Sequence, residues 1–258
     1  MSDELVHLER RDDGVAVVTL DRPKVNAMSI AVLHRLAEIF DDLHADLPGA
    51  VVVTGGARNF AAGFEISELP VGGDAMSINR PFRHALERLS SLPRFVIAAV
   101  NGVALGGGLE LTLACDWRIG ADNARLGVPE ILLGVIPGAG GTQRLARLVG
   151  PAKAKEMAMT GRQVPALEAL AMGLLDEIVP ADEVQDRALA KAAELALGAL
   201  AAQGLAKAAV DGGLLGTLDE GLELEAQLFQ QAIDTDDARI GVESFLANGP
   251  GKATFTGH

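Results

Sequence analysis

The sequence predicts an α/β fold, in which one large domain of strands and helices continues into a helical C-terminal region. Three observations predict it. Short runs of β-branched residues alternate with amphipathic stretches of helical period up to about Pro180. Beyond that point the chain is alanine-rich and its patterns are helical. A chain of 258 residues can also bury about three quarters of its unfolded surface, enough for a large core without disulfides.

The first strand and helix are expected between residues 15 and 45. Val15–Leu20 is a β-branched run that follows the turn residues Asp13 and Gly14. Ser29 can cap a helix that continues to about Ala45, because its hydroxyl can accept a hydrogen bond from a free N–H of the first turn. The apolar residues of this stretch share one helical face: Val32, Leu33, Leu36, Ile39, Phe40 and Leu43.

Two further strand-and-helix units are expected next. Ala50–Thr54 contains three valines in a row and predicts a buried strand, before a long polar loop at 55–70 and a helix at 77–89. Phe95–Val100 predicts another buried strand, after which three glycines at 106–108 open a helix to about residue 114. Finally, we expect short strands at 116–120 and 125–127, a glycine-rich loop at 137–141 and a helix at 142–148.

The C-terminal part is expected to be helical throughout. Residues 182–210 are alanine-rich, and Leu218–Ile233 is amphipathic. No low-complexity linker separates this part from the rest, so we expect it to pack on the core or on a partner subunit. We therefore divide the chain into a core at 1–195 and a helical region at 196–258.

The composition excludes several classes of protein. The net charge is −13 and only 3% of the residues are aromatic, so we expect no nucleic-acid partner, which would require a basic surface or stacking side chains. No stretch of about 20 apolar residues could cross a membrane, and the charged N-terminus lacks the apolar segment of a signal peptide. Cys115 is the only cysteine, so a reducing, cytoplasmic location is expected.

Several well-known site motifs are missing. The glycines at 106–108 follow a strand, but Leu111 stands where a dinucleotide-binding fingerprint requires its third glycine. The sequence contains no phosphate-binding P-loop, no nucleophilic serine in a G-x-S-x-G elbow, and neither an H-E-x-x-H motif nor a cysteine cluster. We therefore expect neither a nucleotide cofactor nor a metal.

What remains is a glycine loop with two glutamates. The backbone N–H groups at the start of a helix are free, and they can stabilise a developing oxyanion. Glu110 follows the glycines at 106–108, and Glu130 follows a proline at the start of an apolar segment. Two carboxylates in an apolar pocket acquire different pKa values, which suits an acid and a base. On local chemistry alone, both could equally be surface residues, and the glycines could serve only packing and turns.

Four segments give the chain a resemblance to the crotonase family, also called enoyl-CoA hydratase/isomerase. The segment at 21–28 resembles the family's Arg-Pro and Asn-Ala segment, and the other three resemble F-x-A-G-x-D-[IL], N-G-x-x-x-G-G-G-x-E and P-E-x-x-L-G-x-x-P-G-x-G-G-T, at 60–66, 101–110 and 129–142. The resemblance implies a spiral of ββα units that holds the CoA and catalytic site, with the C-terminal helices forming homotrimers or hexamers.

The resemblance also implies the residues of the site. Phe64 and Gly107 would form an oxyanion hole with their N–H groups, and Glu110 and Glu130 would be the catalytic acid–base pair. The substrate and its CoA part, which is no separate cofactor, would bind at the following residues: Arg22, Lys24, Val25, Ala62, Phe64, Glu65, Ile66, Gly106 and Gly138. Phe64 replaces a small residue of the family pattern and Glu65 replaces its aspartate.

The expected function is hydration of a trans-2-enoyl-CoA to a 3-hydroxyacyl-CoA, because the hydratases of the family have glutamate at both positions. An enoyl-CoA isomerase, which needs one carboxylate, and another acyl-CoA enzyme of the crotonase type are the alternatives. A CoA-binding protein without catalytic activity is the non-enzymatic alternative, and the intact Glu110, Glu130 and Gly107 argue against it.

Overall fold

The centre of the core is a six-stranded sheet with the strand order β1-β2-β3-β4-β6-β9, in the computed structural model that describes residues 5–257. Its strands are β1 (Val6–Arg10), β2 (Val15–Leu20), β3 (Ala50–Thr54), β4 (Phe95–Val100), β6 (Trp117–Ala121) and β9 (Glu177–Val179). β1 and β2 are antiparallel and every other neighbouring pair is parallel. β3 is buried at every residue, as is typical of a parallel strand covered on both faces.

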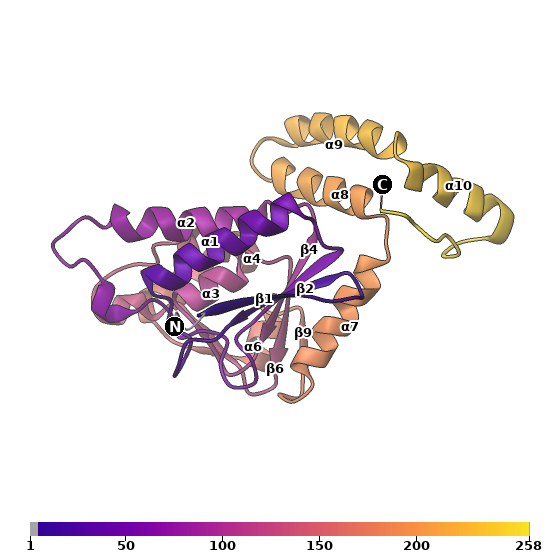
Figure 1. Cartoon of the computed structure of the whole chain (residues 1–258). Helices are drawn as coiled ribbons and strands as arrows, with labels where there is room; N and C mark the ends of the chain where they lie inside the picture. Colours follow the sequence, from indigo (N-terminus) through magenta and orange to yellow (C-terminus); the bar gives the residue numbers. More distant parts are fainter. Residues whose placement is uncertain (1–4, 258) are drawn as a thin grey trace.

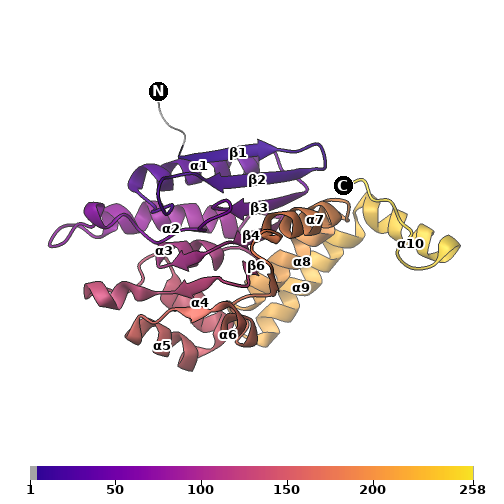
Figure 2. The same ribbon diagram turned by 90° about the horizontal axis from the view of Figure 1, so that it is seen from below.

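A smaller sheet and a set of helices surround this centre (Figures 1 and 2). The smaller sheet has the order β5-β7-β8, from β5 (Val103–Leu105), β7 (Arg125–Gly127) and β8 (Val164–Pro165). The helices of the core are α1 (Ile30–Ala45), α2 (Met76–Ser90), α3 (Gly107–Thr112), α4 (Gly141–Val149), α5 (Pro151–Thr160), α6 (Ala166–Ala171) and the 3₁₀ helices η1 (Ile66–Glu68) and η2 (Pro129–Leu133).

The expected first helix is confirmed together with its cap. Ser29 precedes α1, and its hydroxyl accepts a hydrogen bond from the N–H of Val32 at 3.3 Å. All six apolar residues that predicted the buried face of this helix are buried. The strands expected at Val15–Leu20, Ala50–Thr54 and Phe95–Val100 are also confirmed.

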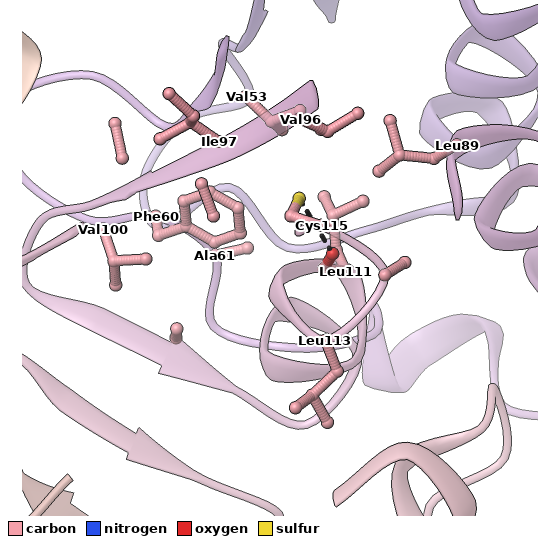
Figure 3. Close-up of a cluster of buried hydrophobic side chains, with 14 of the residues drawn as sticks. Val53, Phe60, Ala61, Leu89, Val96, Ile97, Val100, Leu111, Leu113 and Cys115 are labelled. Atoms are coloured by element: carbon pink, nitrogen blue, oxygen red, sulfur yellow. Dashed lines mark hydrogen bonds between the residues drawn. The ribbon is translucent and has the colours of Figure 1, made fainter. Parts of the chain in front are cut away.

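The short helix α3 is fixed to the sheet by its apolar side chains (Figure 3). Leu111 in α3 and Leu113 at its end lie in the buried cluster with Val53 of β3 and Ile97 of β4. The Cys115 thiol donates a hydrogen bond to the carbonyl of Leu111 at 3.5 Å. Burial raises the pKa of this thiol to about 12, so Cys115 acts here as a core residue. These contacts fix the position of α3.

The helical stretch expected at 182–210 is confirmed and consists of two helices. α7 (Val184–Ala196) and α8 (Leu200–Gly213) meet at an angle of 107°. α7 buries Val184, Ala188 and Ala192, and it packs on β3 and β4 of the core. The helices α8, α9 (Leu218–Ile233) and α10 (Asp236–Asn248) extend away from the sheet, with α8 and α9 side by side (Figure 1).

No single helix among the described residues is long and apolar enough to cross a membrane. The bent pair α7 and α8 passes that test only in length and composition. Residues 1–4 of the N-terminal segment, in which we expect no signal peptide, lie outside the described residues.

Several elements were not expected from the sequence. They include β1, β5, β8, β9, η1, α5, α6 and α10. Most are short, and a strand of two or three residues carries too little periodicity to be recognised. The loop expected at 55–70 is not uniformly irregular, because it contains η1 and a parallel bridge between Phe64 and Met28.

An ion pair joins the helical region to the core. The ammonium of Lys207 on α8 lies 2.8 Å from Asp116, which directly precedes β6, and also donates to the carbonyl of Arg94 at 3.2 Å. Asp116 additionally accepts a hydrogen bond from the N–H of Val96 at 2.8 Å. Burial raises the pKa of Asp116, and the ammonium of Lys207 opposes this shift by favouring the ionised carboxylate.

Replacing Lys207 should therefore destabilise the fold. We expect Lys207→Met to lower the free energy of unfolding by roughly 1–3 kcal/mol, because a partly buried carboxylate loses its cationic partner. Urea denaturation measures this value. Lys155→Met, on the exposed surface of α5, is the matched control and should stay within about 0.5 kcal/mol of the unmodified protein. Equal stability of both variants would contradict a role for the ion pair.

Candidate active site

Glu110 is a buried carboxylate at the start of a helix. Gly106 precedes α3 with φ +51° and ψ −124°, a conformation that favours glycine. Glu110 lies in the first turn of this helix and is 2% exposed. Its Oε1 accepts hydrogen bonds from the N–H groups of Ala139 and Gly141, both at 2.7 Å. The glycine-rich loop at 137–141 thus forms a cradle for this carboxylate.

Opposing effects act on the charge of Glu110. Burial raises its pKa, while the two N–H donors and the nearby guanidinium of Arg144 lower it. Burial is the largest effect, so the pKa remains above the ordinary value for glutamate. Arg144 lies on α4 and also donates to the carbonyl of Ala139 at 3.3 Å. The same arginine therefore holds the loop and favours the ionised form of Glu110.

Glu130 is a second carboxylate of the same site, in a different environment. It belongs to η2, and its Oε2 is buried without a hydrogen-bond partner among the described residues. Burial raises its pKa to about 7, with a further contribution from the charge of Glu110. A Cβ atom added at Gly106 would lie 3.1 Å from Oε1 of Glu130, so this carboxylate lies against the glycine turn that precedes α3.

Two backbone N–H groups lie at the meeting point of two chain segments. Gly63 precedes Phe64 and Gly106 precedes Gly107, and a Cβ atom added at Gly106 would be 3.6 Å from the Cα of Gly63. The N–H groups of Phe64 and Gly107 donate to no other group in the part of the chain that the structure describes. Free N–H donors from two segments in contact are what the binding of an oxyanion requires.

The conformation at Gly107 depends on the absence of a side chain. A Cβ atom at this position would lie 2.6 Å from Cζ of Phe82 and 2.8 Å from Cε of Met28. Both side chains are almost completely buried and pack behind the glycine. Any larger residue at 107 would move the start of α3 or displace the Phe82 ring.

The segments that should bind CoA are brought side by side. The N–H of Ala62 donates to the carbonyl of Val25 at 3.0 Å, and the Arg22 guanidinium forms an ion pair with Glu65 at 2.7 Å. Lys24, Val25 and Ile66 are exposed next to these contacts, and Gly138 is exposed in the loop that holds Glu110.

The ion pair gives a structural role to Glu65, which replaces an aspartate of the family pattern. Its carboxylate accepts from the N–H of Ser67 as the cap of η1, and Arg22 is the main reason that its pKa is lowered. Arg22 is therefore balanced by an anion of the same chain, whereas the ammonium of Lys24 is exposed. This pairing was not expected from the sequence.

Four further residues that support the site were also not anticipated. Ala139 and Gly141 supply the donors to Glu110, Arg144 holds their loop, and the Asn26 amide donates to the carbonyls of Gly55, Asn59 and Phe60. The family pattern carried a signal for Asn26 and Gly141, and no pattern marked Ala139 or Arg144. Among the described residues, no group of three or more His, Cys, Asp or Glu is placed to hold a metal ion.

The overall fold is that of solved enoyl-CoA hydratases of the crotonase class, which the sequence resembles. A profile described as enoyl-CoA hydratase/isomerase matches residues 10–257. The chain therefore belongs to the enoyl-CoA hydratase/isomerase family.

Individual relatives agree with this assignment over nearly the full length. The chain is 40% identical to a probable enoyl-CoA hydratase of Mycobacterium bovis over 241 residues, which cover 93% of this chain and 94% of the relative. It is 38% identical to a short-chain-enoyl-CoA hydratase of Clostridium acetobutylicum, with 92% of each chain covered. The structure of an enoyl-CoA hydratase from Bacillus anthracis superposes with a TM-score of 0.91 at 35% identity, covering 99% of this chain and 100% of that one.

The raised pKa of Glu130 should make stability depend on pH. The carboxyl is protonated in both the folded and the unfolded chain at low pH, but between the ordinary glutamate pKa of 4.5 and about 7 only the unfolded chain has released the proton. The folded state therefore loses stability as the pH rises through this window. Glu130→Gln should gain roughly 1–2 kcal/mol over the unmodified protein by pH 8, after allowance for partial exposure.

Thermal or chemical denaturation at pH 4, 6 and 8 measures this difference. Glu223→Gln, on the exposed surface of α9, is the matched control and should show no such trend. A difference between Glu130→Gln and the unmodified protein that is constant over this range would contradict the raised pKa.

Proposed function

We propose that the protein is an enoyl-CoA hydratase that adds water across the 2,3 double bond of a trans-2-enoyl-CoA. The observation that carries the proposal is the pair of glutamates in unlike environments beside two free N–H groups. Glu110 is held by two N–H donors near a guanidinium, and Glu130 has a pKa near neutrality and a buried oxygen without a partner among the described residues. Relatives named enoyl-CoA hydratase support the same reaction.

The chemistry follows from these environments. The N–H groups of Phe64 and Gly107 would bind the thioester oxygen and stabilise the enolate that forms when water adds to Cβ. Glu110 would take a proton from that water, because its donors and Arg144 favour the ionised form. Glu130 would give its proton to Cα, because a carboxyl with a pKa of about 7 is still substantially protonated at neutral pH. The product is a 3-hydroxyacyl-CoA, and solvent returns each glutamate to its starting state.

The CoA part of the substrate would lie along the paired segments at 22–28 and 61–66. Lys24 offers an exposed ammonium for a phosphate, and Val25, Ala62 and Ile66 offer an adjoining, largely apolar surface. Arg22 would contribute only together with Glu65, because the two are ion-paired. We further propose that the helical region assembles homotrimers or hexamers and that the protein acts in the cytoplasm, without a nucleic-acid or membrane partner.

An enoyl-CoA isomerase is the second candidate, because the matched family includes isomerases. Moving a double bond requires one carboxylate to shuttle a proton, whereas hydration uses two. The reaction of variants that lack one carboxylate therefore separates the two activities.

Amide replacement of either glutamate should abolish hydration. We expect the unmodified protein to consume the conjugated absorbance of trans-2-butenoyl-CoA, and Glu110→Gln and Glu130→Gln each to lower kcat about 10²–10⁴-fold. Glu223→Gln on α9 is again the control and should retain full activity.

Other outcomes would redirect the assignment. Absence of hydration in the unmodified protein with butenoyl and longer enoyl-CoAs would contradict the hydratase proposal. Double-bond migration in a 3-enoyl-CoA that survives the loss of one glutamate, without any hydration, would favour the isomerase.

The oxyanion hole makes a separate prediction, because it uses backbone rather than side-chain groups. Gly107→Ala should lower kcat by about 10²-fold or more, since the new Cβ displaces the N–H that faces the thioester oxygen. Phe64→Ala preserves its N–H and should cost less than about tenfold. Steady-state kinetics with the same substrate provide both values. An equal loss in the two variants would argue against a backbone role for residue 107.

A further inference from the structure

A side chain of α2 contacts the loop that holds Glu110. Asn79 lies in the first turns of this helix and is partly buried. Its Nδ2 donates a hydrogen bond to the carbonyl oxygen of Gly138. The two residues are 59 positions apart, so this contact is a tertiary link between α2 and the glycine-rich loop.

The Gly138 carbonyl belongs to the peptide group that also binds Glu110. The carbonyl of Gly138 and the N–H of Ala139 are the two polar ends of one planar unit. That N–H donates to Oε1 of Glu110 at 2.7 Å. Asn79 and Glu110 are therefore hydrogen-bonded to opposite ends of the same peptide group.

This arrangement has two physical consequences. A donor on the carbonyl polarises the peptide and strengthens its N–H as a donor, a cooperative effect of about 10–30% per bond. The same donor also fixes the plane of a peptide whose flanking glycine is exposed and has ample conformational freedom. The next peptide of the loop has its own anchor, because Arg144 donates to the carbonyl of Ala139 at 3.3 Å.

We propose that Asn79 is a positioning residue for Glu110, which it orients through the Gly138–Ala139 peptide group. The inference rests on the proposed hydratase function only for the role of Glu110 as the base that takes a proton from water. The geometric part, a side chain of α2 that controls a buried carboxylate through one peptide, holds for any reaction of the site.

The charged groups near Glu110 allow the effect of Asn79 to be isolated. Glu130 faces it from η2 and Arg144 from α4, while Glu87 of α2 interacts with Arg144. Asn79 carries no charge, so its replacement by another neutral residue leaves these charges in place. Loss of its hydrogen bond weakens a donor to the carboxylate and should raise the pKa of Glu110.

The test measures Glu110 directly in the complete protein without substrate. Carboxyl signals of ¹³C-labelled protein are followed by NMR over pH, and Glu110→Gln identifies the signal of Glu110. Asn79→Ala and the similarly shaped Asn79→Leu should each raise the pKa of Glu110 by about 0.3–1 unit. Asn79→Gln retains a donor and should keep the pKa of Glu110 close to its value in the unmodified protein. His84→Ala, exposed on the same helix, should leave that pKa unchanged.

Hydration kinetics provide the second readout. In Asn79→Ala and Asn79→Leu, kcat should fall about threefold to tenfold while KM changes little, and the acidic limb of the pH–rate profile should move with the pKa of Glu110. An unchanged pKa of Glu110 in a folded Asn79→Leu protein would overturn the proposal. A pKa in Asn79→Gln as high as that in Asn79→Leu would also overturn it. If the unmodified protein hydrates no enoyl-CoA, the proposed function fails, but the NMR titration still decides the role of Asn79.

Discussion

The burial of Glu110 is the constraint on which the rest of the site depends. A carboxylate that is 2% exposed cannot remain ionised without donors, because its lost hydration costs several kcal/mol. The donors are the N–H groups of Ala139 and Gly141, which converge on one oxygen where the glycine-rich loop enters α4. A Cβ atom at Gly141 would already lie 3.0 Å from that oxygen. The glycine at 141 is thus explained by the close approach of a charged oxygen to the main chain.

The three glycines at the start of α3 illustrate why one sequence pattern admits several explanations. Gly106 has a positive φ and lies against Glu130, whereas Gly107 is backed by buried side chains. Gly108 lies so close to the carbonyl of Ala61 that an added Cβ atom would be 2.2 Å from it. Each of the three positions therefore requires glycine for a different structural reason. Together the glycines let the segment before Phe64 contact the helix of Glu110. The dinucleotide fingerprint, by contrast, uses its glycines to admit a pyrophosphate.

How far the sequence alone could predict this structure depended on the range of the interactions involved. The strands at 15–20, 50–54 and 95–100 and the helix α1 were predicted because their periodicity and caps are local. The bend between α7 and α8 was not, because the alanine-rich sequence is helical on both sides and a single glycine between them, Gly198, does not fix an angle. Similarly, the glutamates could be singled out by their neighbours, but the link from Asn79 to Gly138 spans 59 residues without any sequence pattern.

The two glutamates are chemically identical, so only their surroundings can assign them different tasks. Glu110 is the more deeply buried, yet it has two N–H donors and the guanidinium of Arg144. Glu130 is less buried, but its Oε2 has no partner among the described residues and it experiences the charge of Glu110. Repulsion between the two carboxylates makes the doubly ionised state the costly one, and in the proposed reaction the remaining proton would lie on the oxygen that accepts no hydrogen bond from the described residues. That oxygen belongs to Glu130, so the proposed reaction would find a base and an acid in the site at the same pH.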